Sequence, residues 1–294
     1  MTMEPIKEPD TKAGTVPGPA EQAAQPFVLT PENYYSKEAN QLFLSNSQFK
    51  AMYGYPGSPY ACESSAMFAP RTETEALLVG SYVDAAFESD QALAEFKERR
   101  NDALMQKSKK AYYKFVTDAD KAIARARLDP VFMSYLDGSH QTVLTGEIAG
   151  HAFRIKMDAY KPGVRITDLK YVKSSSDSYN EFLKRRVTFI EDYGYHIQGA
   201  IYQEIEYQNS GTRLPFYIAY ITKEDTPDIG VVEIPQDMLN DGLEYVKLSL
   251  AARPVAQIRK SPRKCGRRSC TWCRDQKSLT GHMAWPEFEA YCRT

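Results

Sequence analysis

The sequence predicts an α/β fold in which a small mixed β-sheet is flanked by helices. The first observation is the stretch Thr145–Lys173, which contains three short runs with strand character, at Thr145–Ile148, His151–Tyr160 and Val164–Val172. Turn-forming residues separate these runs, Gly150 after the first and Lys161-Pro162-Gly163 after the second. The second observation is that segments with helical spacing of apolar residues lie on both sides of this stretch.

Before the strands, the chain divides into a tail and a helical region. Residues 1–26 are rich in Pro, Gly, Ala and Glu and have almost no large apolar residues, so we expect a disordered tail followed by one domain over residues 27–258. Helices are predicted at Gln48–Tyr53, Thr74–Ser89, Asp90–Lys110 and Asp118–Leu136. The Asp129-Pro130 pair predicts a break within the last of these.

After the strands, helix and strand patterns alternate. Ser176–Tyr207 is predicted to form one or two long helices, interrupted near Tyr193-Gly194-Tyr195. Strand character returns at Leu214–Thr222 and Ile229–Ile234, and Pro235–Ala252 is again helical. Residues 259–294 form a basic, cysteine-containing C-terminal segment, which we expect to pack on the domain.

The third predicted strand carries polar residues toward its end. Val164, Ile166, Asp168 and Lys170 share one face, because side chains two positions apart point the same way. Asp158 lies near the end of the neighbouring strand, so two carboxylates and a lysine converge at one edge of the sheet. Mg²⁺ favours such carboxylates, together with waters and phosphate oxygens. The arrangement suits metal-assisted cleavage of a phosphodiester, in which the ion polarises the phosphoryl group.

The same three residues also fit a purely structural role. An aspartate and a lysine on neighbouring strands form a cross-strand ion pair on a solvated sheet face. The residues alone leave both interpretations open.

The spacing of Asp158 and Asp168-Leu169-Lys170 resembles the core of the PD-(D/E)XK nuclease superfamily, which implies a restriction-endonuclease-like core. The flanking sequences TGEIAG, at Thr145–Gly150, and YGYHIQGAIYQEI, at Tyr193–Ile205, resemble the RecE-like branch, the exodeoxyribonuclease VIII-type enzymes of phages and prophages. The resemblance covers about Tyr34–Cys273.

This resemblance implies a catalytic or metal-binding role for five residues. A sixth residue, at a position where the family usually binds metal, departs from the family pattern. Asp158 and Asp168 would bind Mg²⁺ or Mn²⁺, Lys170 would orient the attacking water, and Gln198 and Tyr202 would position the DNA strand or water. Gln198 and Tyr202 share a helix face, since they are one turn apart. Asp84 stands where family members usually place a metal-binding histidine. Aspartate also binds these ions through oxygen, so a metal role for Asp84 remains, beside the alternative of a solvated helix surface.

The C-terminal segment predicts a phosphate-binding patch. Arg259–Arg274 is rich in arginine and lysine and has no acidic residue, which suits contacts with a DNA backbone. The candidate DNA-binding residues are Arg259, Lys260, Arg263, Lys264, Arg267 and Arg268.

Three closely spaced cysteines in this segment, Cys265, Cys270 and Cys273, predict a metal site, since thiolates bind Zn²⁺ and Fe–S clusters well. Cys62 or Cys292 could supply a fourth ligand. AddB-type and CRISPR-associated nucleases resemble this order, with one cysteine before the nuclease motifs and three after them, and hold a 4Fe–4S cluster. The spacing within the triplet differs from theirs. A cluster, Zn²⁺ and free thiols therefore all remain open.

Composition sets the remaining limits. The 294 residues are 43% hydrophobic with a net charge of −1, so a sizeable core is expected and a DNA-binding surface must come from local clustering. The chain has no run of 18 apolar residues and no secretory layout at its N-terminus, which favours a cytoplasmic protein of a bacterial or phage-infected cell, without a membrane.

The resemblance implies a metal-dependent DNA exonuclease that degrades linear double-stranded DNA and leaves single-stranded tails for an annealing recombinase. The alternatives are a non-catalytic DNA-binding protein with the same fold, and an endonuclease or single-strand nuclease. The departure at Asp84 favours the non-catalytic alternative, whereas the complete set of the other five residues disfavours it.

Overall fold

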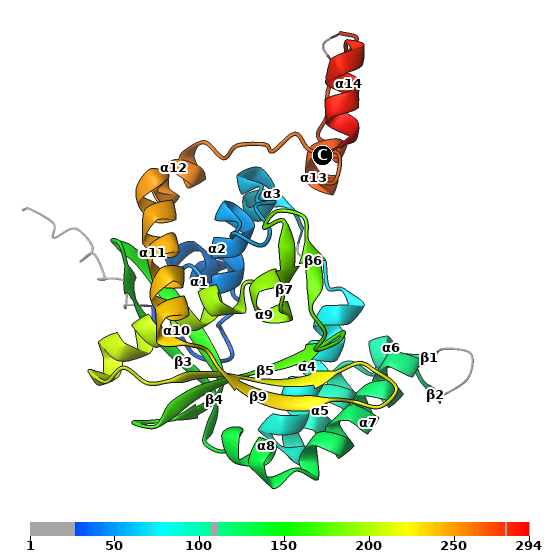
Figure 1. Cartoon of the computed structure of the whole chain (residues 1–294), viewed down its shortest axis with the longest axis vertical. Helices are drawn as coiled ribbons and strands as arrows, with labels where there is room; N and C mark the ends of the chain where they lie inside the picture. The colour runs from blue at the N-terminus through cyan, green and yellow to red at the C-terminus, as the bar shows by residue number, and fades with distance from the viewer. Residues whose placement is uncertain (1–26, 71, 107–110, 280, 294) are drawn as a thin grey trace, which may run out of the picture.

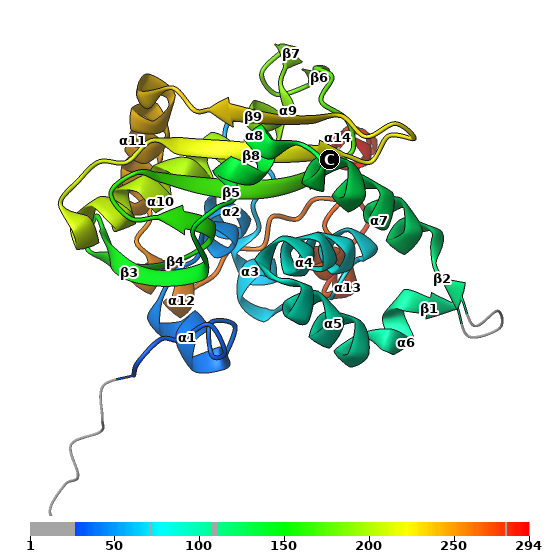
Figure 2. The same ribbon diagram turned by 90° about the horizontal axis from the view of Figure 1, so that it is seen from below.

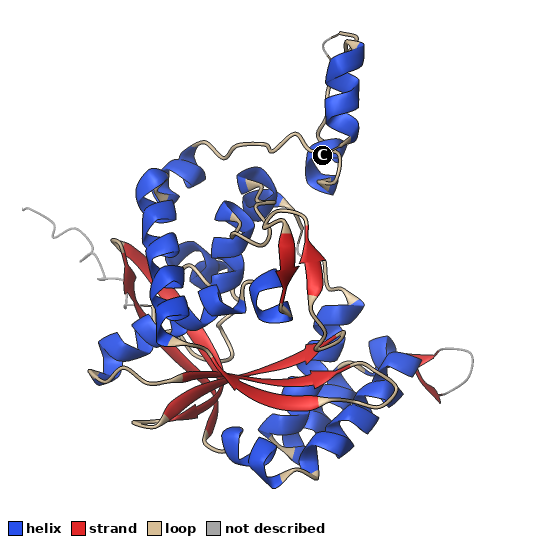
Figure 3. Cartoon of the chain, viewed as in Figure 1, coloured by secondary structure: helices blue, strands red, loops and turns tan. Residues whose placement is uncertain are grey.

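A computed structural model describes residues 27–70, 72–106, 111–279 and 281–293, and its centre is a five-stranded mixed sheet. The strand order is β3-β4-β5-β8-β9, in which β5 and β8 run parallel and the other neighbours run antiparallel. Figure 3 shows the strands in red between the blue helices. The strands are β3 (Ser139–Ile148), β4 (His151–Lys161), β5 (Arg165–Val172), β8 (Phe216–Thr222) and β9 (Ile229–Glu233). The predicted α/β class and mixed sheet are confirmed, and β3 begins six residues earlier than expected.

Helices cover both faces of this sheet (Figures 1 and 2). One face packs against α10 (Tyr195–Ser210) and α11 (Gln236–Ala252), and the other against α4 (Glu75–Glu88), α5 (Asp90–Arg99), α7 (Lys114–Arg127) and α8 (Pro130–Tyr135). Successive residues of one strand therefore enter different cores: Ile218 of β8 packs with the α10 side and Ala219 with the α4 side.

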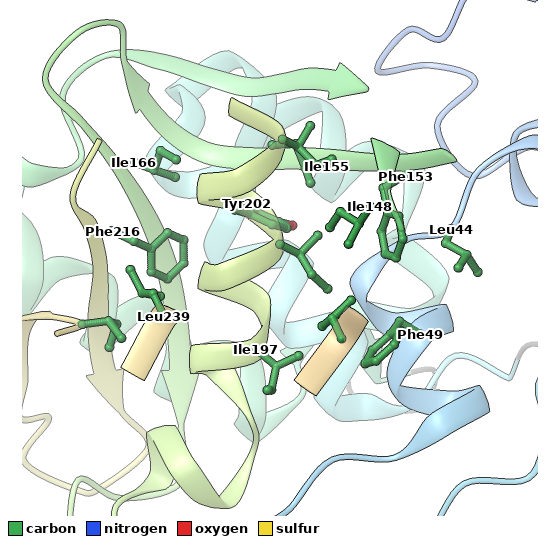
Figure 4. Packing of buried hydrophobic residues seen from close by; sticks show 14 of the residues in the cluster. Leu44, Phe49, Ile148, Phe153, Ile155, Ile166, Ile197, Tyr202, Phe216 and Leu239 are labelled. Carbon is green, nitrogen blue, oxygen red and sulfur yellow. The ribbon is translucent and has the colours of Figure 1, made fainter. Parts of the chain in front are cut away.

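The core on the α10 side joins parts of the chain that are far apart in sequence. Figure 4 shows Ile197 and Tyr202 of α10 among apolar side chains from β4, β5 and β8, with Phe49 and Leu44 closing the cluster from the N-terminal region. Burial of apolar surface stabilises a fold by about 25 cal/mol per Å². The packing of these side chains therefore holds α10 against the strands that carry the predicted site.

Local signals explain where the helices begin. The Thr74 side chain accepts a hydrogen bond from the backbone N–H of Leu77 at the start of α4, and Asp129 caps α8 ahead of Pro130 at its first turn. Gly194, with a φ of 62°, precedes α10, and a Cβ there would lie 2.7 Å from the ring of Tyr55. A residue with a side chain would meet both strain and a clash at this entry to α10.

The prediction of helix throughout Ser176–Tyr207 is wrong for its first part. This part forms a hairpin of β6 (Ser178–Asn180) and β7 (Arg185–Val187), followed by the short helix α9 (Phe189–Asp192). The side chain of Asn180 accepts hydrogen bonds from the backbone N–H groups of Phe182 and Leu183. Such a turn competes with a helix for the same backbone groups, which the apolar spacing does not reveal.

The charged segment predicted as helix from Asp90 also ends early. After α5 it continues as the single turn α6 (Asn101–Leu104) and the two-residue strand β1 (Met105–Gln106), which pairs with β2 (Ala111–Tyr112). Residues 107–110 lie outside the described part of the chain, as does the tail predicted over residues 1–26.

The remaining helices come from the two ends of the chain and lie on the same side of the sheet (Figure 1). The N-terminal group is α1 (Lys37–Leu42), α2 (Asn46–Tyr53) and α3 (Glu63–Phe68), and the C-terminal group is α12 (Val255–Lys260), α13 (Thr271–Asp275) and α14 (Trp285–Cys292). Among the described residues, no helix has the length and apolar character needed to cross a membrane.

Candidate active site

The site forms where two neighbouring strands separate. Residues Ala159–Lys161 of β4 pair with Arg165–Thr167 of β5, and beyond this point the backbone N–H of Leu169 has no backbone partner on β4. This N–H donates instead to Oδ2 of Asp158, at 3.0 Å. The carboxylate of Asp158 thus occupies the gap between the diverging strands and bonds to Leu169, the residue between Asp168 and Lys170.

Asp168 is more buried than Asp84 and Asp158, with 2% of its side chain exposed. Its Oδ1 accepts a 2.5 Å hydrogen bond from Nε2 of Gln198 on α10, and its Oδ2 forms an ion pair with Nζ of Lys170. The side chain of Lys170 is also largely buried. A buried ion pair contributes little net stability, because both charges lose their hydration, so its presence here favours a chemical role.

The charges of this group influence one another. Burial raises the pKa of the Asp168 carboxyl; the Lys170 ammonium opposes this effect and the Asp158 carboxylate adds to it. Burial alone would lower the pKa of Lys170, but Asp168 and Asp158 raise it above its ordinary value. Lys170 is therefore a cation at neutral pH.

Asp84 approaches the same group from α4. Burial and then the Asp158 carboxylate raise its pKa well above the ordinary value, with smaller effects from Lys170 and Asp168. The three aspartates, on α4, β4 and β5, thus repel one another electrostatically. This oxygen-only donor set fits Mg²⁺ or Mn²⁺, and a divalent cation would remove the repulsion.

Tyr202 lies one turn beyond Gln198, but its hydroxyl donates to the backbone carbonyl of Lys156 on β4, at 3.1 Å. Its ring is buried and packs edge-on against Phe216 of β8. The predicted role in positioning DNA or water remains a prediction, and the contacts present here are those that fix α10 to β4.

The sequence did not reveal Lys50, which reaches the site from α2. Its Nζ donates to the carbonyl of Tyr193, at 2.6 Å, and lies 4.9 Å from the ring centre of Tyr55. Burial and then the Lys170 ammonium lower the pKa of Lys50 to about 8, while Asp168 opposes them. Tyr195, whose ring centre is 5.1 Å from Nζ of Lys170, completes this aromatic border. No sequence motif marks Lys50, which lies more than a hundred positions before Asp158.

The cysteines predicted as ligands also come together. The Sγ atoms of Cys62, Cys265, Cys270 and Cys273, which we call the four-cysteine group, lie within 4.8 Å of one another. Cys62 precedes α3, and the other three lie around α13. Cys292, the other candidate for a fourth ligand, is exposed and lies outside the group.

The candidate DNA-binding residues occupy different surroundings. Arg259 and Arg267 line a cleft of about 1260 Å³ between the N-terminal helices and the cysteine segment. The guanidinium of Arg267 donates to the carbonyl of Ala61, at 2.9 Å, and lies over the ring of Tyr60. Its contacts are thus partly structural. The other candidates, together with Arg259, are exposed to solvent: Arg259, Lys260, Arg263, Lys264 and Arg268.

The strand arrangement and the convergence of Asp158, Asp168 and Lys170 define the class: this is a protein of the PD-(D/E)XK nuclease superfamily. The chain belongs to the family described as "PDDEXK-like domain of unknown function (DUF3799)", whose model matches residues 45–276. It is also similar to a crystal structure of a protein from Eubacterium rectale that is provisionally named an exonuclease. The two are 34% identical with a TM-score of 0.82, over 90% of this chain and 99% of that chain. No curated protein matches the chain.

Proposed function

We propose that this protein is a metal-dependent DNA exonuclease that degrades linear double-stranded DNA and leaves single-stranded tails for recombination by annealing. The observation that carries the proposal is the buried ion pair of Asp168 with Lys170, together with the effects of the Asp158 and Asp84 carboxyls on the same charges. The similarity to the Eubacterium rectale protein supports the exonuclease assignment.

The residues of the site divide the work between binding and orientation. Asp158 and Asp168 would hold Mg²⁺ or Mn²⁺, with Asp84 as a third ligand; when bound, the ion supplies a Lewis acid for a phosphoryl oxygen. Gln198 keeps Asp168 in one rotamer through its hydrogen bond to Oδ1. Fixed ligands of this kind avoid reorganisation during the reaction.

Lys170 would orient the attacking water and offset negative charge that develops on the phosphate. Its ammonium is held by Asp168 and by the carbonyl of Leu169, at 3.3 Å. Because its pKa is raised, Lys170 is a hydrogen-bond donor rather than a base at neutral pH. Lys50 places a second ammonium beside the same charges.

The DNA would extend from the site toward basic residues near the C-terminus, including Arg259 and Lys260 at the end of α12. These contacts are to the sugar–phosphate backbone, so binding is expected to weaken as salt is raised. The single-stranded product is the reason to expect an annealing recombinase as partner.

The test compares linear and circular duplexes of one sequence, with and without Mg²⁺, using the wild-type protein and Asp168→Asn. The proposal predicts Mg²⁺-dependent loss of the linear duplex alone, with single-stranded DNA accumulating. Cleavage of the closed circle would indicate an endonuclease and overturn the exonuclease assignment. DNA binding without cleavage of either substrate would identify a non-catalytic DNA-binding protein.

A further inference from the structure

We infer that the four-cysteine group binds a single Zn²⁺ ion in a closed, tetrahedral, structural site, rather than the 4Fe–4S cluster that the family resemblance implies. This inference does not depend on the proposed nuclease function. It rests on the spacing of the sulfurs, the backbone amides that point at them and the contacts that hold the two ends of the chain together.

The spacing of the sulfurs matches ligands that share one central ion. Sγ of Cys273 lies 3.5 Å from Sγ of Cys62 and 3.7 Å from Sγ of Cys265, and all four sulfurs lie within 4.8 Å of one another. Four thiolates around one Zn²⁺ at about 2.3 Å form a tetrahedron whose edges are about 3.8 Å long. The two distances from Sγ of Cys273 agree with these edges.

A cubane cluster requires a wider set of thiols. Each cysteine of a 4Fe–4S cluster binds a different iron atom, so the body of the cluster separates every pair of sulfurs. With every pair within 4.8 Å, the four-cysteine group leaves no space for that body. A disulfide is also excluded by distance, because its sulfurs are about 2.05 Å apart.

Backbone amides direct hydrogen bonds at the sulfurs. The N–H of Ser65 donates to Sγ of Cys62, at 3.4 Å. Backbone groups of Arg267, Cys273 and Gly266 hydrogen-bond to Cys265, Cys270 and Cys273, respectively. Such bonds orient thiolate ligands and disperse their negative charge.

Contacts outside the sulfurs hold the two halves of the site in place. Glu63, directly after Cys62, accepts two hydrogen bonds from the Arg253 guanidinium, at 2.5 and 2.8 Å, and one from the backbone N–H of Arg263. Ser64 donates its N–H to the carbonyl of Arg263 and accepts from the indole of Trp272 through its hydroxyl, at 3.0 Å each. These contacts join the segment that carries Cys62 to the segment that carries the other three cysteines.

The experiment uses full-length protein produced with both zinc and iron available and purified without oxygen under reducing conditions. Zinc, iron and acid-labile sulfide are measured per chain for the wild type, Cys62→Ser, Cys292→Ser and Asp168→Asn. The thermal melting temperature of each protein is measured in parallel. Asp168→Asn controls for zinc that occupies the carboxylate site by chance.

We expect about one zinc per wild-type chain, without iron or sulfide. Cys62→Ser should lose this zinc and melt at a lower temperature, whereas Cys292→Ser and Asp168→Asn should retain it. Stoichiometric iron with sulfide would overturn the inference, as would wild-type protein that holds neither metal. Zinc that survives Cys62→Ser, or that Asp168→Asn loses, would place the ion elsewhere. If Cys62→Ser does not fold, the wild-type metal content still decides between the outcomes.

Discussion

The side-chain amide of Gln198 on α10 donates a 2.5 Å hydrogen bond to Oδ1 of Asp168 on β5, thirty positions earlier in the chain. This bond requires α10 to lie very close to the sheet. Gly199, the next residue, permits that approach, since a Cβ there would lie 2.6 Å from Cδ1 of Phe216 and 2.9 Å from Cδ2 of Leu239. The position of one helix and the orientation of one carboxylate are thus coupled.

This coupling predicts the effect of adding one methyl group at Gly199. Gly199→Ala should lower the free energy of unfolding by about 1–3 kcal/mol, because the new group overlaps two core side chains. Gly80→Ala on α4 is the matched control: its Cβ meets nothing within 4 Å, and alanine favours a helix over glycine by about 1 kcal/mol. Urea denaturation of both variants measures the difference. A stable Gly199→Ala protein would contradict the close approach of α10.

Replacing Asp168, the most buried of the three site aspartates, should abolish the chemistry. Asp168→Asn is expected to reduce Mg²⁺-dependent cleavage by about a hundredfold or more while the fold persists, since a metal ligand supplies several kcal/mol of transition-state stabilisation. Cleavage rates on a linear duplex measure the loss of activity, and circular dichroism spectra show whether the fold persists. Asp241→Asn, at an exposed position on α11, is the control. A near-normal rate in Asp168→Asn would refute the metal assignment.

Lys170→Ala separates orientation from metal binding. It should also inactivate the protein, yet leave metal binding measurable by calorimetry, because the three carboxylates remain. Removal of the ammonium leaves Asp168 without its counter-ion, so metal binding should shift to higher pH. Loss of all metal binding at every pH would instead make Lys170 part of the metal site.

Asp84 is expected to act on metal affinity. Asp84→Ala should raise the Mg²⁺ concentration needed for half-maximal activity, because one of three oxygen ligands is lost. Asp84→His should favour Mn²⁺ over Mg²⁺ relative to the wild type, since imidazole suits softer cations. Activity titrations with each metal measure both effects. Unchanged titrations in both variants would show that Asp84 does not bind the metal.

The carboxylates also make the effect of Mg²⁺ on stability depend on pH. The pKa values of Asp84 and Asp168 are raised in the folded state. Their contribution to stability is complete below about pH 3.9, the ordinary aspartate value, and is lost as pH rises through the raised values. Metal-free protein therefore loses this stabilisation toward neutral pH, where Mg²⁺ binds the ionised carboxylates.

Melting temperatures should accordingly rise more on addition of Mg²⁺ at pH 8 than at pH 5.5. Asp168→Asn should reduce the difference between the two pH values. Equal shifts at both would show that Mg²⁺ binds elsewhere.

Lys50 provides the last prediction. Lys50→Met removes the second ammonium near the carboxylates and should weaken DNA binding more than it slows chemistry, so KM rises more than kcat falls. The dependence of log affinity on log salt concentration should also become less steep, by the amount expected for the loss of about one phosphate contact. Lys247→Met, at an exposed position on α11, is the control. Identical kinetics in the two variants would contradict a role for Lys50.

Local signals in the sequence predicted most of the elements. The alternation along His151–Tyr160 and the break at Asp129-Pro130 correspond to β4 and to the boundary between α7 and α8. The strand ends also indicated that Asp158 and Asp168 meet, because neighbouring strands bring nearby sequence positions together. Family resemblance added Asp84 and Gln198, whose elements have no local feature that points to the site.

The remaining features depend on contacts between distant segments. The Asn180 turn replaces a predicted helix through two hydrogen bonds that apolar spacing does not encode. Lys50 becomes part of the site only because α2 packs beside α10. The sequence alone does not decide whether Cys62 or Cys292 joins the three clustered cysteines, because Cys62 lies more than two hundred positions before them. The fold brings Cys62 to them.

That separation ties metal loading to the order in which the chain is synthesised. Cys62 leaves the ribosome early, but Cys273 follows 211 positions later, after every strand of the sheet. On the proposed zinc site, an ion can be enclosed only once both ends of the domain exist, because metal binding and folding are linked. A chain that stops before Arg259 would carry one ligand of the four and hold no ion. Bound zinc would then distinguish chains that include the C-terminal cysteines from chains that end before them.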